Sequence, residues 1–189
     1  MKNRFKEQGD HIFSWHQHWI IDNPIRRMIH PVERILKGSV TPGMIVADTG
    51  CGTGAFTLAL AHMVGDTGRV IAVDLQAEAL VKVEQKAEMA GMHRRIETWK
   101  CEADDIGNLP VIDFAFAFYM VHEVPDMDRY FSRMAQCIKP GGGMLLVEPK
   151  FHVSRAHFET ELAAAAKVGL VSQLAPQVRL SHAALLKRT

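Results

Sequence analysis

The stretch "VADTGCGTGAF", residues 46–56, decides the fold. It opens with a short apolar run that is typical of a buried strand, and three alternating glycines follow at Gly50, Gly52 and Gly54. Glycines directly after a strand let the backbone turn sharply and come close to a ligand. The apolar run "GAFTLALAHMVG", residues 54–65, comes next. The stretch therefore predicts a strand, a ligand-binding loop and a helix, in that order.

Strand-like and helix-like segments alternate along the rest of the chain. Strands are predicted at 42–48, 69–75, 95–103, 112–121, 144–149, 170–176 and 180–188, with helices at 54–65, 76–91, 125–138 and 155–169. This alternation is typical of an open α/β sheet. The last two strands are too close in sequence for a parallel crossover, so they must run antiparallel. We predict a Rossmann-like three-layer α/β sandwich with a seven-stranded, mostly parallel sheet and an antiparallel last strand.

The link between the third and fourth strands is short. "DDIGNLPV", residues 104–111, offers about eight residues, which span roughly 27 Å when extended. That length is sufficient for a taut loop but not for a crossover helix. We expect this link to have no helix.

Composition narrows the classes of partner. The 22 basic and 21 acidic residues leave a net charge of +1, which argues against nucleic-acid binding by bulk positive charge. Cys51, Cys101 and Cys137 are far apart and form no CxxC motif, which favours a reducing compartment. The longest apolar run, residues 114–121, is too short to span a bilayer. We predict a cytoplasmic protein without nucleic-acid or membrane partners, and a homodimer stays open.

Two cofactors compete for the glycine loop. Gly50, Gly52 and Ala55 fit the dinucleotide fingerprint, and Asp74 follows about twenty residues later, as expected of a ribose ligand for NAD. Asp48 argues against NAD, because its carboxylate would repel a pyrophosphate at this turn. S-adenosylmethionine has no phosphate, and its ammonium and sulfonium groups are cationic.

Further acids follow the other predicted strands. Besides Asp48, these acids are Asp104 and Asp105 after the third strand, Glu123 after the fourth and Glu148 on the fifth. Each of them alone could be a helix cap or a solvated strand end. Together they predict a pocket with an acidic edge, which suits a cationic ligand, while the glycine amides can bind that ligand's carboxylate.

The same motifs resemble a known family. "VADTGCGTG" (46–54) resembles the acid-x-Gly-x-Gly-x-Gly loop of class I S-adenosylmethionine-dependent methyltransferases, and "AVDL" (72–75) resembles their second-strand acid. "ADDIGNLP" (103–110), "KPGGGMLLVEP" (139–149) and the terminal strand pair are also similar to that family, over about residues 40–188. The nearest branch is the compact one that resembles ubiquinone and menaquinone biosynthesis methyltransferases. The resemblance implies an S-adenosylmethionine-dependent enzyme with a small-molecule acceptor.

The resemblance also implies residue roles. Asp48 and the amides of the glycine loop would hold the methionine part, Asp74 the ribose diol, and Asp105 or its neighbour Asp104 the adenine amino group. The hydrophobic side chains after the second and third strands would sandwich the adenine ring. The predicted cofactor-binding residues are Asp48, Gly50, Cys51, Gly52, Gly54, Asp74, Leu75, Asp104, Asp105, Ile106 and Tyr119.

The segment "YMVHEVPD", residues 119–126, lies where an acceptor would approach. His122 or Glu123 could act as a general base, because imidazole titrates near neutral pH and a carboxylate beside it can share the role. The alternative for His122 is a purely structural role, packing and capping the next turn. Glu148 and His152 flank the same predicted mouth and are expected to meet the substrate. Glu148 lies in an otherwise apolar strand and so needs a partner or a ligand.

The N-terminal segment "HIFSWHQHWIIDNP", residues 11–24, is rich in aromatic residues. We predict that residues 1–38 form a helical lid over the acceptor pocket rather than a separate domain, and that 39–189 form the cofactor-binding domain. Trp15, His18 and Trp19 are then candidate substrate contacts. The histidines of the segment could bind a metal, but an HxH pair on a helix diverges, so no metal site is predicted.

Three other functions compete with this prediction. An NAD-dependent oxidoreductase should have no acid before the glycines, and it normally has a YxxxK pair or a second half-domain; neither Tyr119 nor Tyr130 is part of a YxxxK pair. An RNA or protein methyltransferase would usually carry a recognition domain or an NPPY-like motif after the fourth strand. A cofactor-binding module without turnover stays possible, because no single residue compels a catalytic role.

Overall fold

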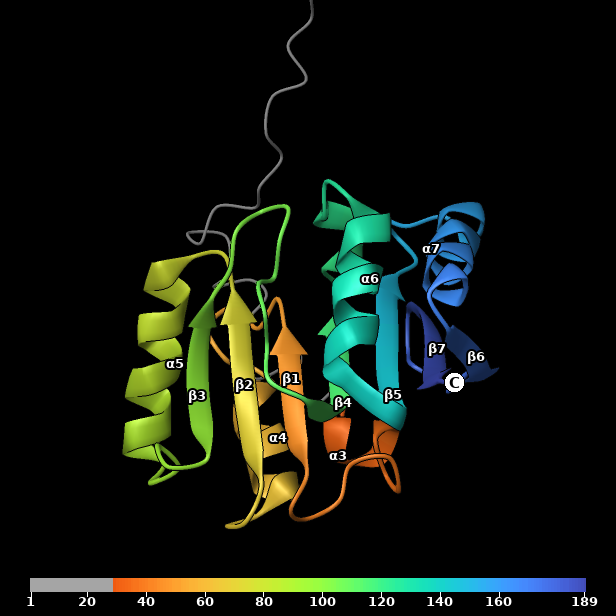
Figure 1. The fold of residues 1–189 in the computed structure, drawn as a ribbon. Helices are drawn as coiled ribbons and strands as arrows, with labels where there is room; N and C mark the ends of the chain where they lie inside the picture. The colour runs from red at the N-terminus through yellow and green to blue at the C-terminus, as the bar shows by residue number, and fades with distance from the viewer. Residues whose placement is uncertain (1–28) are drawn as a thin grey trace, which may run out of the picture.

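The computed structural model describes residues 29–189, which form one seven-stranded sheet with helices on both faces (Figure 1). The strands are β1 (Ile45–Thr49), β2 (Arg69–Asp74), β3 (Ile96–Lys100), β4 (Ile112–Phe118), β5 (Ile138–Pro149), β6 (Leu170–Leu174) and β7 (Ser181–Arg188). Their order is β3-β2-β1-β4-β5-β7-β6, and β7 is antiparallel to both of its neighbours. The predicted fold class is confirmed. Among residues 29–189, no helix combines the length and apolar character needed to cross a membrane.

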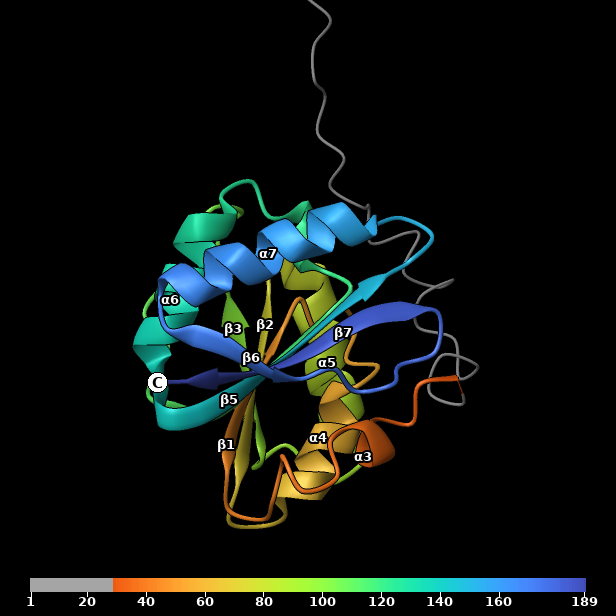
Figure 2. The ribbon, with the colours of Figure 1, turned by 90° about the vertical axis from the view of Figure 1, so that its right-hand side faces the viewer.

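The helices form the two outer layers (Figure 2). Within residues 29–189 they are α3 (Val32–Ile35), α4 (Thr57–Val64), α5 (Ala77–Met89), the short 3-10 helix η2 (Val121–Glu123), α6 (Met127–Cys137) and α7 (Arg155–Lys167). Helices α3, α4 and α5 pack on one face, whereas α6 and α7 pack on the other. The side chain of Ser154 caps α7 as a helix-start residue should, accepting a hydrogen bond from the His157 amide at 3.1 Å.

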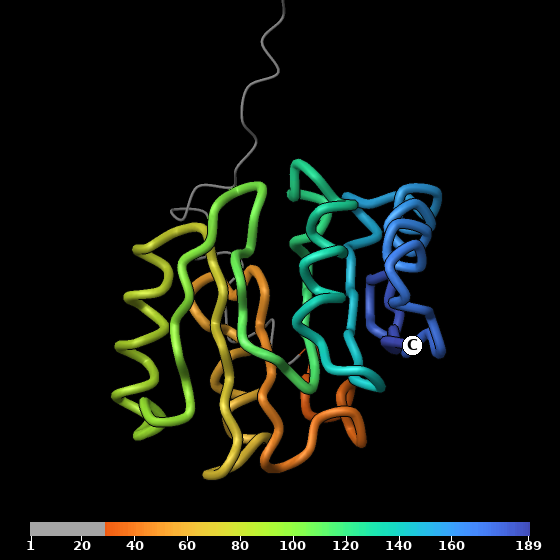
Figure 3. The backbone as a smooth tube through the Cα atoms, in the orientation of Figure 1, coloured from red at the N-terminus to blue at the C-terminus, as the bar shows by residue number. Residues whose placement is uncertain are grey.

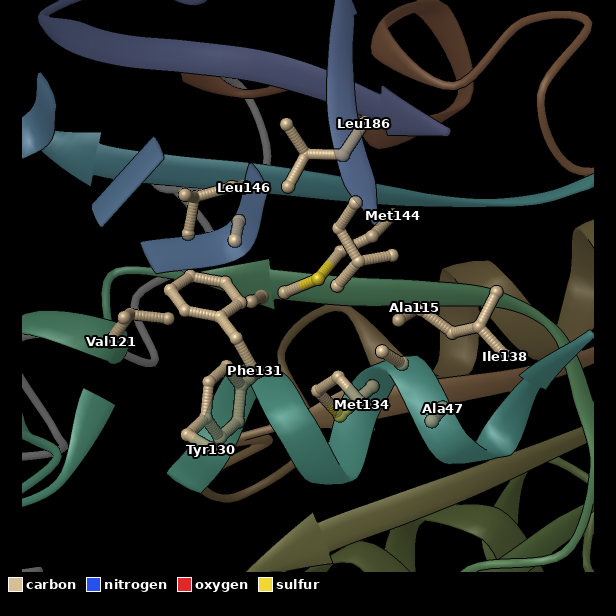
Figure 4. Packing of buried hydrophobic residues seen from close by; sticks show 14 of the residues in the cluster. Ala47, Ala115, Val121, Tyr130, Phe131, Met134, Ile138, Met144, Leu146 and Leu186 are labelled. Atoms are coloured by element: carbon tan, nitrogen blue, oxygen red, sulfur yellow. The ribbon is translucent and has the colours of Figure 1, made fainter. Parts of the chain in front are cut away.

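The central strand β4 is buried on both faces because helices cover each of them. Its alanines face α6, while Phe114, Phe116 and Phe118 face α4. Figure 4 shows Phe131 and Met134 of α6 among the residues that fill the space over the small side chains. This pairing of small strand residues with large helix residues fixes the distance between α6 and the sheet.

Strands β1 and β4 lie side by side in the middle of the sheet. From β1 the chain adds β2 and β3 on one side, and from β4 it adds β5, β7 and β6 on the other, so the direction in which strands are added reverses between β1 and β4. In open α/β sheets the crevice at the carboxyl ends of such strands is the usual ligand site. The glycine loop follows β1, and η2 follows β4, so the topology brings these two segments to one crevice.

The link between β3 and β4 contains no helix, as predicted. Residues 101–111 rise above the carboxyl end of β3 and then return along the sheet to the start of β4 (Figure 3). Ile106 and Leu109 are buried in the core on the α6 side. The extended link therefore covers part of the face that a crossover helix would cover.

Strand β5 is longer than predicted. The sequence predicts a strand only at 144–149, but β5 already begins at Ile138, includes the residues of "KPGGG" (139–143) and pairs with β4 through an irregular register. The glycines make this pairing possible: a Cβ on Gly142 would lie 2.6 Å from Ile138 Cγ2 and 2.8 Å from the Asp113 carbonyl oxygen. The backbones thus approach more closely than any side chain would allow.

Residues 29–38 belong to the core of the described structure. Val32 and Leu36 are buried in the cluster that α4 forms with the sheet. The lid was predicted over residues 1–38. Because Val32 and Leu36 pack in the core, the lid stays a proposal for the residues before 29 only. Trp15, His18 and Trp19 lie outside the described residues.

Candidate functional site

The glycine loop after β1 is held between two neighbouring segments. The amides of Gly50 and Cys51 both donate to the Val73 carbonyl of β2, at 2.9 and 3.0 Å. Gly50 has φ +68°, and an added Cβ would lie 2.7 Å from Met120 Cβ. The loop therefore has to pass closely between β2 and the end of β4, which only glycine allows here.

Asp48 lies beneath this loop and is almost fully buried, with 3% of its surface exposed. Its Oδ2 accepts a hydrogen bond from Thr57 Oγ1 at 2.6 Å. Thr57 is the first residue of α4, so the carboxylate lies at a helix N-terminus, where negative charge is favourable. The expected contact with the methionine part of the cofactor stays a prediction.

Asp74 connects the loop to α5. Its Oδ2 accepts from the Gly52 amide at 2.8 Å, and its Oδ1 accepts from the Gln76 amide at 2.9 Å. A carboxylate has about four acceptor sites, so both oxygens can still accept a hydroxyl hydrogen bond. The position fits a ribose diol, and the two amide bonds orient the carboxylate.

Asp104 and Asp105 pair with arginines of α6. Asp105 contacts Arg129 at 2.7 Å and Arg133 at 2.9 Å, and accepts from the Gly107 amide at 2.9 Å. Hydrogen bonds from Arg133 and Gly107 lower the pKa of Asp105 to about 2. The exposed Asp104 contacts Arg129 at 3.0 Å. The structure thus gives both acids a role in joining the β3–β4 link to α6, and the adenine contact stays a prediction.

The remaining predicted cofactor residues lie after the ends of β2, β3 and β4. Leu75 is half-buried after β2, and Ile106 is buried, with its carbonyl accepting from Trp99 Nε1 at 3.1 Å. Tyr119 has a left-handed backbone (φ 64°), and its hydroxyl lies 2.6 Å from Ser181 Oγ of β7. The Tyr119 hydroxyl is therefore directed to β7.

His122 and Glu148 form a hydrogen-bonded pair at the carboxyl ends of β4 and β5. His122 Nδ1 lies 2.5 Å from Glu148 Oε2, and Glu148 Oε1 accepts from the Val121 amide at 2.9 Å. Glu148 is fully buried. Burial by itself would lower the pKa of His122, but the hydrogen bond and charge of Glu148, with Glu123, outweigh it and raise this pKa.

Glu123 and His152 surround the same imidazole. Glu123 Oε1 is 3.8 Å from His122 Nε2, and the His152 ring centre is 4.9 Å from that of His122. Burial raises the pKa of Glu123, and the charges of Glu148 and Asp74 act in the same direction.

The thiol of Cys51 is buried in the glycine loop. Burial, and then the charges of Asp48 and Asp74, raise the pKa of Cys51 well above its usual value, so its thiol stays protonated. Within residues 29–189, no group of three or more His, Cys, Asp or Glu side chains could hold a metal ion.

Several residues of the site were not identified from the sequence. Met120 packs against Gly50, and Arg129 and Arg133 bind the acids of the β3–β4 link. Only tertiary structure brings these pairs together. Glu161 had a signal in the sequence: it is spaced with Phe158, Ala164 and Ala165 on the buried face of α7.

The crevice suits S-adenosylmethionine in its chemistry. The glycine loop presents backbone close to the crevice, and no Lys or Arg occurs between Val46 and Phe56 to bind a pyrophosphate. Asp74 and Asp48 provide negative charge on both sides of the loop. These residues match a cationic, phosphate-free nucleoside better than NAD.

Comparisons with known proteins agree with this assignment. The family described as "methyltransferase domain" matches residues 46–142, more than half of the chain. The ubiquinone/menaquinone biosynthesis C-methyltransferase of Shewanella frigidimarina is 29% identical over 125 residues, covering 62% of this chain and 49% of that protein. The demethylmenaquinone methyltransferase of Bacillus cereus is 31% identical over 113 residues, covering 58% and 46%. The chain thus spans about half the length of the curated relatives it matches.

A solved structure supports the fold over almost the whole chain. An S-adenosylmethionine-dependent methyltransferase from Aquifex aeolicus superposes with a TM-score of 0.83, covering 94% of this chain and 100% of that one, at 23% identity. The similarity at this identity concerns the fold, while the family match rests on the sequence of residues 46–142. The chain belongs to the methyltransferase domain family.

Proposed function

We propose that this chain transfers the methyl group of S-adenosylmethionine to a small hydroxylated aromatic ring, with His122 as the general base. The observation that carries the proposal is the His122–Glu148 pair, which lies next to the glycine loop through Met120. The family membership supports methyl transfer. The NAD alternative has no support from any of the comparisons.

The cofactor would be held by the residues around the glycine loop. Asp74 would accept hydrogen bonds from the ribose hydroxyls, and the loop amides with Asp48 would hold the amino-acid part. Bound S-adenosylmethionine supplies a methyl carbon that its positive sulfur already activates toward a nucleophile. The protein therefore has to align the acceptor, exclude water and remove a proton.

Proton removal follows from the geometry of the pair. With Glu148 accepting the Nδ1 proton of His122, the Nε2 lone pair is left to accept a proton from the acceptor hydroxyl. Loss of that proton makes the ring more nucleophilic. The imidazolium that results is stabilised by the Glu148 carboxylate, whose Oε2 lies 2.5 Å from His122 Nδ1.

The acceptor class is inferred from the relatives' names and from the side chains nearby. Those relatives are named as methyltransferases of ubiquinone, menaquinone or demethylmenaquinone. At this end of the sheet the Phe151 side chain is 80% exposed and its ring lies 6.4 Å from that of Tyr119. An aromatic acceptor could stack in such surroundings. The segment with Trp15 and Trp19 would then close over it.

The test uses a defined acceptor. Purified protein is incubated with S-adenosylmethionine and 1,4-naphthohydroquinone, and the methylated product is measured by mass spectrometry. We expect product with the wild type and at least a hundredfold less with His122→Asn, the usual effect of losing a general base. His93→Asn, at an exposed histidine, is the control. Equal rates for His122→Asn and the control would refute the base role.

A further inference from the structure

Tyr119 and Leu180 have backbone conformations that bulky residues rarely adopt. Among residues 29–189 they are the two non-glycine residues with a positive φ, 64° at Tyr119 and 58° at Leu180. In this left-handed region the Cβ atom comes too close to the following carbonyl oxygen, so the conformation is unfavourable for both side chains. Such backbone strain persists only where the surrounding structure holds it, and it gathers at functional sites.

One hydrogen bond joins the two strained turns. Tyr119 follows β4, Leu180 precedes β7, and the Tyr119 hydroxyl lies 2.6 Å from Oγ of Ser181, the first residue of β7. Ser181 donates its own hydroxyl proton to the Arg179 carbonyl at 3.0 Å, so Tyr119 has to be the donor in the bond to Ser181. Ser181 is buried, which shields this end of the bond from water.

The ring and the backbone of Tyr119 have contacts of their own. The ring centre lies 4.5 Å from that of Phe118 and 5.8 Å from that of His30, and the amide donates to the Val147 carbonyl of β5 at 2.8 Å. The hydroxyl also lies 3.4 Å from His30 Nε2. Tyr119→Phe therefore keeps the ring and amide contacts and removes those of the hydroxyl, whereas Ser181→Ala removes the bond to Ser181 alone.

The short helix η2, which carries the candidate base, begins two residues after Tyr119. Met120, which lies between them, packs against the glycine loop. The Val121 amide and His122 Nδ1 then meet the two carboxylate oxygens of Glu148, at 2.9 and 2.5 Å. If Tyr119 relaxed to an ordinary backbone conformation, the chain would leave β4 in another direction, and both contacts with Glu148 would be displaced.

We propose that Tyr119 is a positioning residue: its hydrogen bond to Ser181 holds the left-handed backbone that places His122 against Glu148. The cost of a left-handed conformation at a bulky residue and the net gain from one hydrogen bond are of similar size. Loss of the bond therefore lets Tyr119 leave this conformation while the protein stays folded. The inference rests on the proposed function only for its catalytic meaning, because the position of His122 can be measured without turnover.

The experiment follows His122 by NMR in the full-length protein, without cofactor or acceptor. Histidine side chains are labelled with 15N, the His122 signals are assigned with His122→Asn, and the pH is varied from about 5 to about 10. The variants are Tyr119→Phe, Ser181→Ala and Ser181→Thr, the last of which keeps a hydroxyl. Thr98→Val is the control, because the Thr98 hydroxyl also makes a 2.6 Å side-chain hydrogen bond, to Glu84 of α5.

We expect the His122 titration midpoint to fall by about 0.5–1 pH unit in Tyr119→Phe and in Ser181→Ala. Burial lowers the pKa of His122 while Glu148 raises it, and Glu148 acts less on a displaced ring. The double variant should titrate like Tyr119→Phe, since both substitutions remove the same bond. Ser181→Thr and Thr98→Val should titrate like the wild type. The other titratable groups that face the ring are unchanged in all of these variants.

A His122 midpoint that stays at its wild-type value in Tyr119→Phe or in Ser181→Ala would overturn the inference, even if the variant unfolds at a lower temperature. A purely structural hydrogen bond would change stability without moving the imidazole. A shift in Ser181→Thr as large as in Ser181→Ala would overturn the inference as well, because the hydroxyl would then not be the group that matters. If the midpoints shift as expected but His122→Asn still methylates naphthohydroquinone, the proposed base role fails and the positioning of His122 by Tyr119 stands.

Discussion

The side chain of Met120 occupies the space that a Cβ atom on Gly50 would need, with a separation of 2.7 Å. Gly50 is the first residue of the glycine loop, and Met120 joins β4 to the turn that carries His122. The glycine loop and the turn that carries His122, which are the proposed cofactor and acceptor sides, are therefore in direct contact. A change in the loop should be transmitted to the candidate base.

Replacing Gly50 by alanine tests this contact. The variant needs an alanine at φ +68° and a displaced Met120, so we expect unfolding free energy to fall by about 2–4 kcal/mol. Gly91→Ala is the matched control, because Gly91 has φ +66° but nothing within 4 Å of its added Cβ. It should cost only about 1 kcal/mol. Equal losses in urea denaturation would show that Met120 does not constrain the loop.

Asp74 combines a binding role with a structural one. Asp74→Ala should weaken S-adenosylmethionine binding by about 1.5–3 kcal/mol, the range for hydrogen bonds to a charged group. It also removes the acceptor of the Gly52 and Gln76 amides, so stability should fall too. Asp74→Asn keeps one acceptor oxygen and should be the more stable variant. Calorimetric titration of each folded variant checks this, and unchanged affinity in both would contradict the ribose role.

Asp105 should hold the β3–β4 link against α6. In Asp105→Asn the pairs with Arg129 and Arg133 are lost, and we expect faster proteolysis between residues 101 and 111. Asp104→Asn is the control, because exposed Asp104 contacts Arg129 alone. The pKa of Asp105 is lowered to about 2, so its contribution is present above about pH 4 and is lost as pH falls toward 2. Identical cleavage rates in the two variants would contradict the role.

The sequence was sufficient to predict the order of the elements because local patterns define them. The glycines after β1, the helical spacing of α5 and the cap at Ser154 all act over a few residues. The strand in "KPGGG" was missed because glycine indicates a turn locally, while in the fold it permits close pairing with β4.

The candidate site was predictable in its position but not in its pairing. Acids at the ends of parallel strands were expected at one edge, and Asp48, Asp74 and Glu148 lie there. Their partners are far away in the sequence: Gly52 is 22 residues from Asp74, and His122 is 26 residues from Glu148. Asp105 is an example. Its carboxylate pairs with Arg129 and Arg133 of α6, whereas the motif alone would leave it available to a ligand.

The N-terminal segment gives a prediction of its own. Deletion of residues 1–22 should leave a folded protein, because residues 29–189 already form the seven-stranded sheet and the helices that cover it. Cofactor should still bind, while naphthohydroquinone turnover should be lost. Fluorescence of Trp15 and Trp19 should change on ligand binding in a Trp99→Phe background, since Trp99 is the third tryptophan of the chain. Full turnover by the deletion variant would remove the lid role.

The pH dependence of methyl transfer tests the His122–Glu148 pair most directly. His122 accepts a proton only when neutral, so the rate should rise with pH through its pKa, which lies above the usual value. Glu148→Gln removes the carboxylate that raises this pKa. The acid limb of the profile should then move to lower pH. The maximal rate should fall, because the imidazolium loses its stabilising charge and the imidazole ring loses the hydrogen bond that orients it. Glu159→Gln should keep the wild-type profile.

A Glu148→Gln profile with an unmoved acid limb would mean that another group accepts the proton. Glu123, whose Oε1 is 3.8 Å from His122 Nε2, would be the next residue to replace.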